Sequence, residues 1–237
     1  MKWSSLGQWL QRSLPNRCYL CQQPVDQGIG LCRWCLTDAE PGPLCLSCST
    51  PLPQAPPWRC GRCQSRHRWR PLVCAYPYHS PMGYLCGSIK IHQQLGLIPP
   101  LCDALAERWQ ALWESGAIDK PKALVPVPMH RSRLPLRGFN HAVLLADALG
   151  QRLQLPVRDD LLVKVRATVP QHDLSGAARR RNLAQAFAAT EADPVEGIAV
   201  VDDIATTGAT LAAVAAALRR GGHQISQYAV LASAMAR

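Results

Sequence analysis

The sequence predicts an α/β protein in which a mostly parallel sheet is flanked by helices, with a small cysteine-rich module before it. Two observations support this fold class. Four Cys-x-x-Cys pairs, separated by prolines and short turns, fill residues 18–63, and from about residue 71 strand-like segments alternate with helix-like ones. Alternating strands and helices are joined by right-handed crossovers, which makes neighbouring strands parallel. A chain of 237 residues is long enough for one such domain and a small module.

The individual elements follow from the spacing of the apolar residues. Strands are expected at 72–78, 123–128, 198–201 and 227–232, and helices at 100–114, 140–153 and 211–218. Segment 198–201 is apolar at every position, as is typical of a central parallel strand that is buried on both faces. The last helix ends in two arginines followed by Gly221, a common helix stop. We expect three parts: a helical segment at 1–17, the cysteine-rich module at 18–66 and the α/β domain at 71–237.

Composition narrows the class of partner. The net charge of +10 favours polyanions, either nucleic acid or a phosphorylated small molecule, without choosing between them. No apolar run approaches the roughly 20 residues that span a bilayer, and the first residues lack the continuous apolar stretch of a secretory signal. We therefore expect a cytoplasmic protein without a membrane span. Eleven cysteines in such a protein indicate metal binding rather than disulfides.

The spacing of the cysteines predicts two structural zinc sites. Two Cys-x-x-Cys turns supply the four thiolates of a closed tetrahedral site, which leaves no coordination position open for catalysis. Sequential pairing of the turns gives a double zinc ribbon, and a crossed arrangement fits the spacing as well. Redox thiols or an iron–sulfur cluster are the rival chemistries. The expected ligands are Cys18, Cys21, Cys32, Cys35, Cys45, Cys48, Cys60 and Cys63. Cys74, Cys86 and Cys102 lie outside the pattern and are expected to be small buried hydrophobic residues.

A second group of polar residues follows the apolar strand 198–201. Two carboxylates, Asp202 and Asp203, come at its carboxyl end, where open α/β sheets bind ligands. The turn into the next helix offers backbone N–H groups and three hydroxyls to a phosphate, and Gly208 allows close approach. The paired carboxylates suit the two hydroxyls of a ribose, or a magnesium ion. The alternative is a capped helix with incidental aspartates. The expected phosphate-binding residues are Ala205, Thr206, Thr207, Gly208, Ala209 and Thr210.

This string resembles the phosphoribosyl pyrophosphate signature of type I phosphoribosyltransferases, and the whole chain resembles the ComF family, which joins a zinc-ribbon module to such a domain. Further family-like residues are 124–128, 137–140, Gln171, Leu174, 179–181, Asn182 and Phe187. Two positions depart from the family pattern. His141 stands where glutamine is common, and the string 89–91 replaces the usual Leu-Lys-aromatic sequence. Both departures concern the side of the pocket that would receive a base.

The resemblance implies a type I phosphoribosyltransferase-like fold and a role for each residue of the signature. The turn 206–210 would hold the 5′-phosphate, and Asp202 and Asp203 would bind the ribose hydroxyls as the catalytic pair, with magnesium. Arg131 and Arg137, together with Arg133, would contact the pyrophosphate, whose developing charge fixed guanidinium groups stabilise. Segment 166–182 would close over the site, and residues 80–98 would form the hood that reads the acceptor base. The expected activity is transfer of ribose 5-phosphate from phosphoribosyl pyrophosphate.

A non-catalytic factor that binds single-stranded DNA is the alternative function. The ComF family is associated with DNA uptake and with the use of DNA as a nutrient, so the resemblance also implies DNA and other competence or DNA-processing proteins as partners. Clustered cations beside an aromatic ring suit phosphate contacts and base stacking. The undamaged acid pair and phosphate turn favour the enzyme instead. The basic clusters are Arg66, Arg68 and Arg70 around Trp69, then Arg131, Arg133 and Arg137, then Arg179, Arg180 and Arg181.

Overall fold

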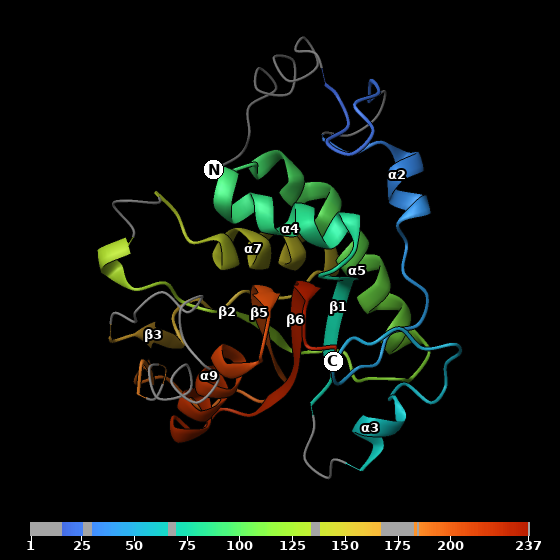
Figure 1. The fold of residues 1–237 in the computed structure, drawn as a ribbon. Helices are drawn as coiled ribbons and strands as arrows, with labels where there is room; N and C mark the ends of the chain where they lie inside the picture. Colours follow the sequence, from blue (N-terminus) through green and yellow to red (C-terminus); the bar gives the residue numbers. More distant parts are fainter. Residues whose placement is uncertain are drawn as a thin grey trace.

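A computed structural model describes residues 16–25, 30–65, 70–133, 138–166, 183 and 185–236. Its centre is a four-stranded parallel sheet of order β1-β6-β5-β2 (Figure 1). The strands are β1 (Leu72–Pro77), β2 (Ala123–Pro126), β5 (Ile198–Ala205) and β6 (Ile225–Ser233). All four predicted strands are therefore confirmed, and so is the α/β class. The expected helical segment at 1–17 lies almost entirely outside the described residues.

Strand β5 is longer than its apolar run. The prediction ended the strand at Val201, but its pairing with β6 continues as far as Ala205, which lies opposite Ser233. Strand β5 lies between β6 and β2, and residues 198–201 are fully buried. Backbone pairing with a neighbour that is nine residues long continues the strand beyond its apolar part. As a result, Asp202 and Asp203 lie within the strand and not after it.

Helices cover both faces of the sheet (Figure 1). Helices α5 (Ile98–Glu114) and α7 (His141–Leu153) pack against each other, and α4 (Pro81–His92), which the short helix η1 (Leu95–Leu97) connects to α5, contacts β1, β5 and β6. Helix α9 (Ala209–Arg220) packs on the other side, against β3 (Leu162–Lys164) and β4 (Phe187–Ala189). Strands β3 and β4 form a separate antiparallel ribbon. The apolar side chains accordingly fall into two large clusters.

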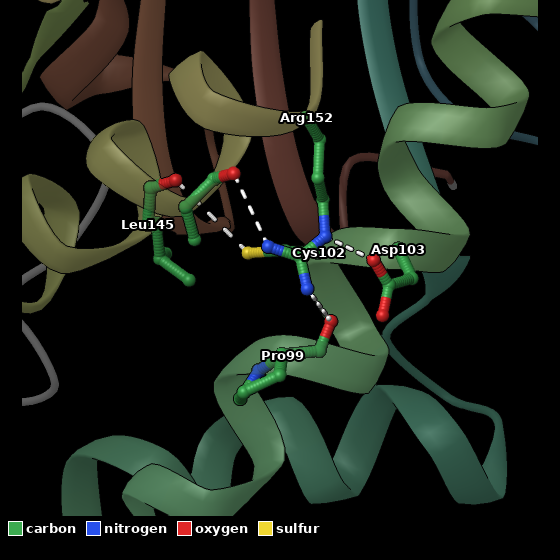
Figure 2. Close-up of polar contacts among 6 residues, drawn as sticks. Pro99, Cys102, Asp103, Leu145 and Arg152 are labelled. Carbon is green, nitrogen blue, oxygen red and sulfur yellow. Dashed lines mark hydrogen bonds and ion pairs between the residues drawn. The ribbon is translucent and has the colours of Figure 1, made fainter. Parts of the chain in front are cut away.

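Helices α5 and α7 are also joined by polar contacts, which Figure 2 shows. The guanidinium of Arg152 in α7 donates to the carboxylate of Asp103 and to the carbonyl oxygen of Pro99 at 3.4 Å. In the buried part of the interface, the Cys102 thiol lies 4.0 Å from the carbonyl oxygen of Leu145. Buried apolar residues from both helices, such as Leu105 and Leu145, belong to the same cluster. The pair therefore forms one layer that supports β1, β6 and β5.

The periodicity of the sequence did not predict helix α4, nor the strands β3 and β4. The apolar residues of α4 do not form one continuous stripe, and two glycines in its interior lower its helix propensity. Ser80 caps its N-terminus by accepting from the N–H of Gly83 at 3.1 Å. A Cβ on Gly83 would lie only 2.2 Å from the carbonyl oxygen of Pro77. The glycine therefore allows α4 to lie directly against the end of β1.

The cysteine-rich module packs on the α/β domain. Its described residues include the short helices α2 (Arg33–Asp38) and α3 (Gly61–Gln64). Its residues Cys18 and Leu46 are buried in the same cluster as Trp109 of α5. The boundaries at 18–66 and 71–237 stay predictions. Among the described residues, no helix has both the length and the apolar character needed to cross a membrane.

A buried polar contact in the core provides a test of this packing. Trp109 is fully buried, and its indole N–H donates to the side-chain carbonyl of Gln227 at 2.7 Å. Trp109→Phe removes that donor, so we expect a loss of about 1–3 kcal/mol in the free energy of unfolding. Urea unfolding followed by circular dichroism measures it. Gln227→Leu also breaks the bond that the Gln227 amide donates to the carbonyl oxygen of Asp119 at 2.9 Å, so the contact with Trp109 is measured by a double-mutant cycle. The double variant should be less unstable than the sum of the single variants, and one as unstable as that sum contradicts this reading.

Candidate functional site

The eight cysteines of the N-terminal module come together as two groups of four. Cys18, Cys21, Cys32 and Cys35 form the first group, and Cys45, Cys48, Cys60 and Cys63 form the second. Within each group the sulfur atoms all lie within 4.8 Å of one another. The turns therefore pair sequentially, first with second and third with fourth, and not in the crossed arrangement. Among the described residues, each group consists of four converging thiols and no further ligand, which fits a closed tetrahedral zinc site, so each group can hold one structural zinc ion.

Backbone N–H groups point at these sulfur atoms. The N–H of Cys35 donates to the Cys32 sulfur at 3.4 Å, and the N–H of Cys60 donates to the Cys45 sulfur at 3.3 Å. Burial raises the pKa of Cys18, but hydrogen bonds from the backbone of Cys21, Cys32 and Leu20 outweigh it and lower that pKa to about 6. Burial and the adjacent thiols raise the pKa of Cys63 to about 12. Thiolates this close repel one another, and a bound cation removes that repulsion.

The other three cysteines behave as the sequence predicted. Cys74, Cys86 and Cys102 are buried in the α/β domain, and none of them belongs to either group of four. Burial raises the pKa of the Cys74 and Cys102 thiols to about 12 and raises that of Cys86 well above its usual value. A protonated thiol in an apolar core is inert toward metals and oxidants. These residues contribute packing and no chemistry.

Asp202 and Asp203 occupy the carboxyl half of β5. Asp203 is 7% exposed, and its carboxylate accepts from the N–H of Ile204 at 2.8 Å. Asp202 is half-buried and accepts from the N–H of Asp203 at 2.9 Å. Because successive side chains of a strand point to opposite faces, the two carboxylates have different surroundings. The sheet therefore places both acids on its central strand, one of them more open to solvent than the other.

The turn after β5 has the form of an anion cradle. Gly208 precedes α9 with a φ of +73°, a conformation that favours glycine, and Thr206 and Thr207 are exposed. The Thr207 hydroxyl accepts from the N–H of Ala209 at 3.4 Å. Helix α9 is twelve residues long, so its first N–H groups and its dipole favour negative charge at this end. The turn lies at the carboxyl end of β5, as predicted.

Only some of the predicted basic residues lie within the part of the chain that the structure describes. Arg131 is exposed in the short helix η2 (Arg131–Arg133), whereas Arg137 and the cluster 179–181 lie outside the described residues, as do 66–69. Arg70 is half-buried, and its guanidinium donates to the carbonyl oxygen of Ile225 at 2.7 Å. It therefore joins the chain to the start of β6. Segment 166–182 is described only at its first residue.

Two strings that carry the family resemblance have structural roles as well. Asn140 caps α7 by accepting from the N–H of Ala142 at 3.2 Å, and its amide donates to the carbonyl oxygen of Val127 at 3.0 Å. It therefore fixes the loop after β2 to the start of α7. His141, where the family commonly has glutamine, is 5% exposed and packs edge-on against Phe139 with ring centroids 5.0 Å apart.

Sequence patterns missed two features near the turn. The second cysteine group and the turn share a cavity of about 270 Å³, lined by Arg62, Cys60, Thr206, Thr207 and Met235 among others. In addition, Tyr78, His79 and Tyr84 form a cluster of edge-to-face rings with centroids 5.4–6.2 Å apart. The members of each feature are separated along the chain or carry no motif of their own, so no local spacing could reveal them.

Comparisons with known proteins identify relatives over most of the chain. The DNA utilization protein YhgH of Salmonella typhimurium is 33% identical over 215 residues, which cover 89% of this chain and 93% of that protein. Competence protein F of Haemophilus influenzae is 31% identical over 87% of this chain and 92% of that protein. Competence protein ComFC of Bacillus subtilis is 26% identical over 88% of this chain and 80% of that protein. No protein-family model matches the chain.

Among solved structures, the chain is similar to adenine phosphoribosyltransferases. The protein of Saccharomyces cerevisiae, solved with adenine and an imino-altritol bisphosphate, has a TM-score of 0.38 and 19% identity, over 60% of this chain and 72% of that one. The protein of Leishmania donovani has a TM-score of 0.37 and 11% identity, over 62% and 68%.

Proposed function

The chain belongs to the ComF family, and on this premise we propose that it binds phosphoribosyl pyrophosphate with Mg²⁺ at the turn between β5 and α9 and acts in DNA uptake or utilisation. The observation that carries the proposal is the order of groups at the end of β5. Two carboxylates on the central strand are followed by an exposed threonine-rich turn and the N-terminus of a full-length helix. The carboxylates suit the hydroxyls of a ribose, the turn suits its 5′-phosphate, and the helix N-terminus favours the negative charge of that phosphate.

Each group of residues has its own role in a pentosyl transfer. The turn 206–210 anchors the 5′-phosphate through N–H groups and hydroxyls, which fixes the ribose relative to the sheet. Asp202 and Asp203 accept hydrogen bonds from the ribose hydroxyls, and their carboxylates would hold Mg²⁺. Bound magnesium would neutralise charge that develops on the leaving pyrophosphate. Arg131 is exposed in η2, which follows β2, the strand that pairs with β5, and we assign it to the pyrophosphate. Arg137 belongs to the same predicted loop.

The cysteine groups complete the proposal. We assign one structural zinc ion to each group, because four sulfur atoms within 4.8 Å of one another match the tetrahedral thiolate sites of zinc ribbons. Metal binding of this kind contributes directly to folding, since small loop-rich modules bury too little apolar surface to fold alone. The zinc ions thus support the fold, and the end of β5 with the turn after it binds the substrate.

Calorimetric titration tests the ligand assignment. We expect phosphoribosyl pyrophosphate to bind the zinc-containing protein one to one in the presence of Mg²⁺, and the affinity to fall when Mg²⁺ is replaced by a chelator. Adenosine, which has no phosphate, is the control and should not bind. Release of pyrophosphate on addition of nucleobases then distinguishes an enzyme from a binding protein. No heat with phosphoribosyl pyrophosphate at millimolar concentration would reject the assignment.

A second candidate function, the binding of single-stranded DNA, is favoured by the ring cluster at α4. Tyr84 is 56% exposed and packs edge-on against Tyr78, with ring centroids 5.5 Å apart. A Cβ on Gly87 of α4 would lie within 4.0 Å of both the Tyr78 ring and the Ile204 side chain of β5. The cluster therefore lies near the carboxyl end of the central strand. Exposed aromatic rings offer a stacking surface to bases of any sequence.

We expect single-stranded DNA to bind with micromolar affinity at low salt. Three to six phosphate contacts would give a slope of log affinity against log salt between about −2 and −4, at about −0.7 per contact. Tyr84→Ala should cost about 1–3 kcal/mol in binding, whereas Tyr84→Phe keeps the stacking ring and should bind almost as the parent protein does. Fluorescence anisotropy with a short labelled oligonucleotide measures both. Binding that is absent, or equal for Tyr84→Ala and Tyr84→Phe, rejects the stacking surface.

A further inference from the structure

The second cysteine group lies directly beside the turn after β5. A cavity of about 270 Å³ separates them, with Thr206 and Thr207 on one side and Arg62, Cys60 and Thr50 on the other. Figure 1 shows the chain end beside the segment that leads to α3, on which Arg62 lies. This volume is just below the range of about 300–1,000 Å³ for pockets that enclose whole drug-sized ligands, so the cavity suits a phosphate group and not a complete nucleotide.

Met235 connects the two sides of the cavity. It packs against the second cysteine group, and a Cβ on Gly208 would lie only 3.1 Å from its terminal methyl. The preceding residues hold it in place, because Ser233 pairs with Ala205 and the N–H of Ala234 donates to the carbonyl oxygen of Ala205 at 2.8 Å. The end of β6 therefore brings one side chain into contact with both the turn and the cysteines.

The polar groups on the cysteine side are arranged by the metal ligands themselves. Arg62 lies between Cys60 and Cys63, and the short helix that carries it has Cys60 as its N-cap and contains Cys63. The Cys48 sulfur lies 3.1 Å from the Thr50 hydroxyl and 3.7 Å from the Cys60 sulfur. A tetrahedral metal bound by these thiolates would fix the peptide from Cys60 to Cys63 and, with it, the base of the Arg62 side chain.

We propose that the second cysteine group forms one wall of the phosphate site, with Arg62 supplying a guanidinium to the 5′-phosphate held by Thr206 and Thr207. This inference rests on the proposed function. The turn offers hydroxyls and N–H groups and carries no cationic side chain of its own. An exposed arginine across the cavity supplies the charge that a phosphate dianion requires. The metal at this group then positions ligand-binding residues, whereas the metal at the first group is structural only.

Titration with ribose 5-phosphate tests the role of Arg62. Arg62→Ala should lower the affinity for ribose 5-phosphate at least tenfold, and Arg62→Lys should lower it less because the charge remains. Arg33→Ala removes an exposed arginine of the same module that does not line the cavity, so it should leave the affinity unchanged. Equal affinity for the parent protein and Arg62→Ala overturns the proposal and leaves the turn assignment intact. A parent protein that does not bind ribose 5-phosphate overturns both.

A matched pair of cysteine variants tests the role of the metal. Cys18 and Cys45 are the first ligands of their groups, both are fully buried, and neither lines the cavity. Cys45→Ser, with the second metal lost, should bind ribose 5-phosphate at least tenfold more weakly, whereas Cys18→Ser should bind as the parent protein does. Metal content, measured by elemental analysis, must show one zinc ion left in each. Equal weakening by the two variants overturns the selective role of the second group.

Zinc release provides a readout that does not depend on affinity. Coupling between two sites is reciprocal, so ribose 5-phosphate should slow the loss of zinc from the second group to a chromogenic chelator. In Cys18→Ser, where only the second group holds metal, saturating ribose 5-phosphate should slow release severalfold. In Cys45→Ser the remaining zinc should leave at the same rate with and without the ligand. If either variant fails to fold, the parent protein still tests the coupling between ligand and metal. We expect ribose 5-phosphate to slow one of the two phases of zinc release from the parent protein. If both phases keep their rates, the coupling is overturned.

Discussion

Asp202→Asn combined with Asp203→Asn should abolish magnesium-dependent binding of phosphoribosyl pyrophosphate and leave the protein folded. Asparagine keeps the size of each side chain and its ability to accept the N–H bonds from Asp203 and Ile204. It removes the negative charge that holds magnesium and strengthens hydrogen bonds from the ribose. Hydrogen bonds to charged groups contribute about 1.5–3 kcal/mol each, so we expect affinity to fall at least about a hundredfold. Calorimetric titration with and without Mg²⁺ measures the loss.

The surroundings of the two carboxylates also separate this role from a structural one. Asp203 is 7% exposed, so a purely structural role would appear as a lower melting temperature of Asp203→Asn alone. Asp202 is more open, and Asp202→Asn should weaken ligand binding without changing the melting temperature. A double variant that binds as the parent protein does would remove these acids from the site. A double variant that does not fold would instead identify the acid pair as structural.

The purified protein should contain two zinc ions per chain, and Cys32→Ser should contain one. The sulfur atoms of each group lie within 4.8 Å of one another, so losing one thiolate leaves a three-ligand site with much lower affinity. Because structural zinc contributes about 10–16 kcal/mol of apparent binding free energy in small zinc modules, the first half of the module should then become protease-sensitive. The parallel sheet should remain folded, since its core residues pack between the strands and helices α5, α7 and α9.

Elemental analysis and limited proteolysis measure these two effects. Arg33→Ala is a suitable control, because it alters an exposed residue of the same module without touching a sulfur ligand. Iron in place of zinc, or at most one zinc ion in protein prepared without oxygen, would contradict the assignment and favour the redox or iron–sulfur chemistry that the cysteine spacing also allows.

Most of the sheet could be predicted because its signals are local. The run from Ile198 to Val201 is apolar at every position, and such a run in a parallel sheet is a buried strand. The extension of β5 to Ala205 depends on pairing with β6, which is a contact between segments, so the apolar run alone ended it too early. Helix α4 went unrecognised for a related reason. Its position is set by the close approach that Gly83 allows at Pro77, and not by an amphipathic pattern.

In the candidate sites, too, local features could be predicted and features that depend on contacts between distant segments could not. Each cysteine group and the turn after β5 are contiguous or nearly so, and their chemistry can therefore be read from spacing. Which cysteine turns pair with which is a tertiary property, and spacing left it open until the two groups were seen. Arg62 illustrates the limit most clearly. It is one basic residue of the short helix α3, and only the fold brings it to the same cavity as Thr206 and Thr207.

A crystal structure of the zinc-containing protein with phosphoribosyl pyrophosphate and Mg²⁺ tests the central claim most directly. The account predicts the 5′-phosphate on the N–H groups of the turn 206–210, the ribose hydroxyls at Asp202 and Asp203, and anomalous zinc peaks within both cysteine groups. Ligand density at another place on the molecule, with the turn after β5 filled only by solvent, would contradict it.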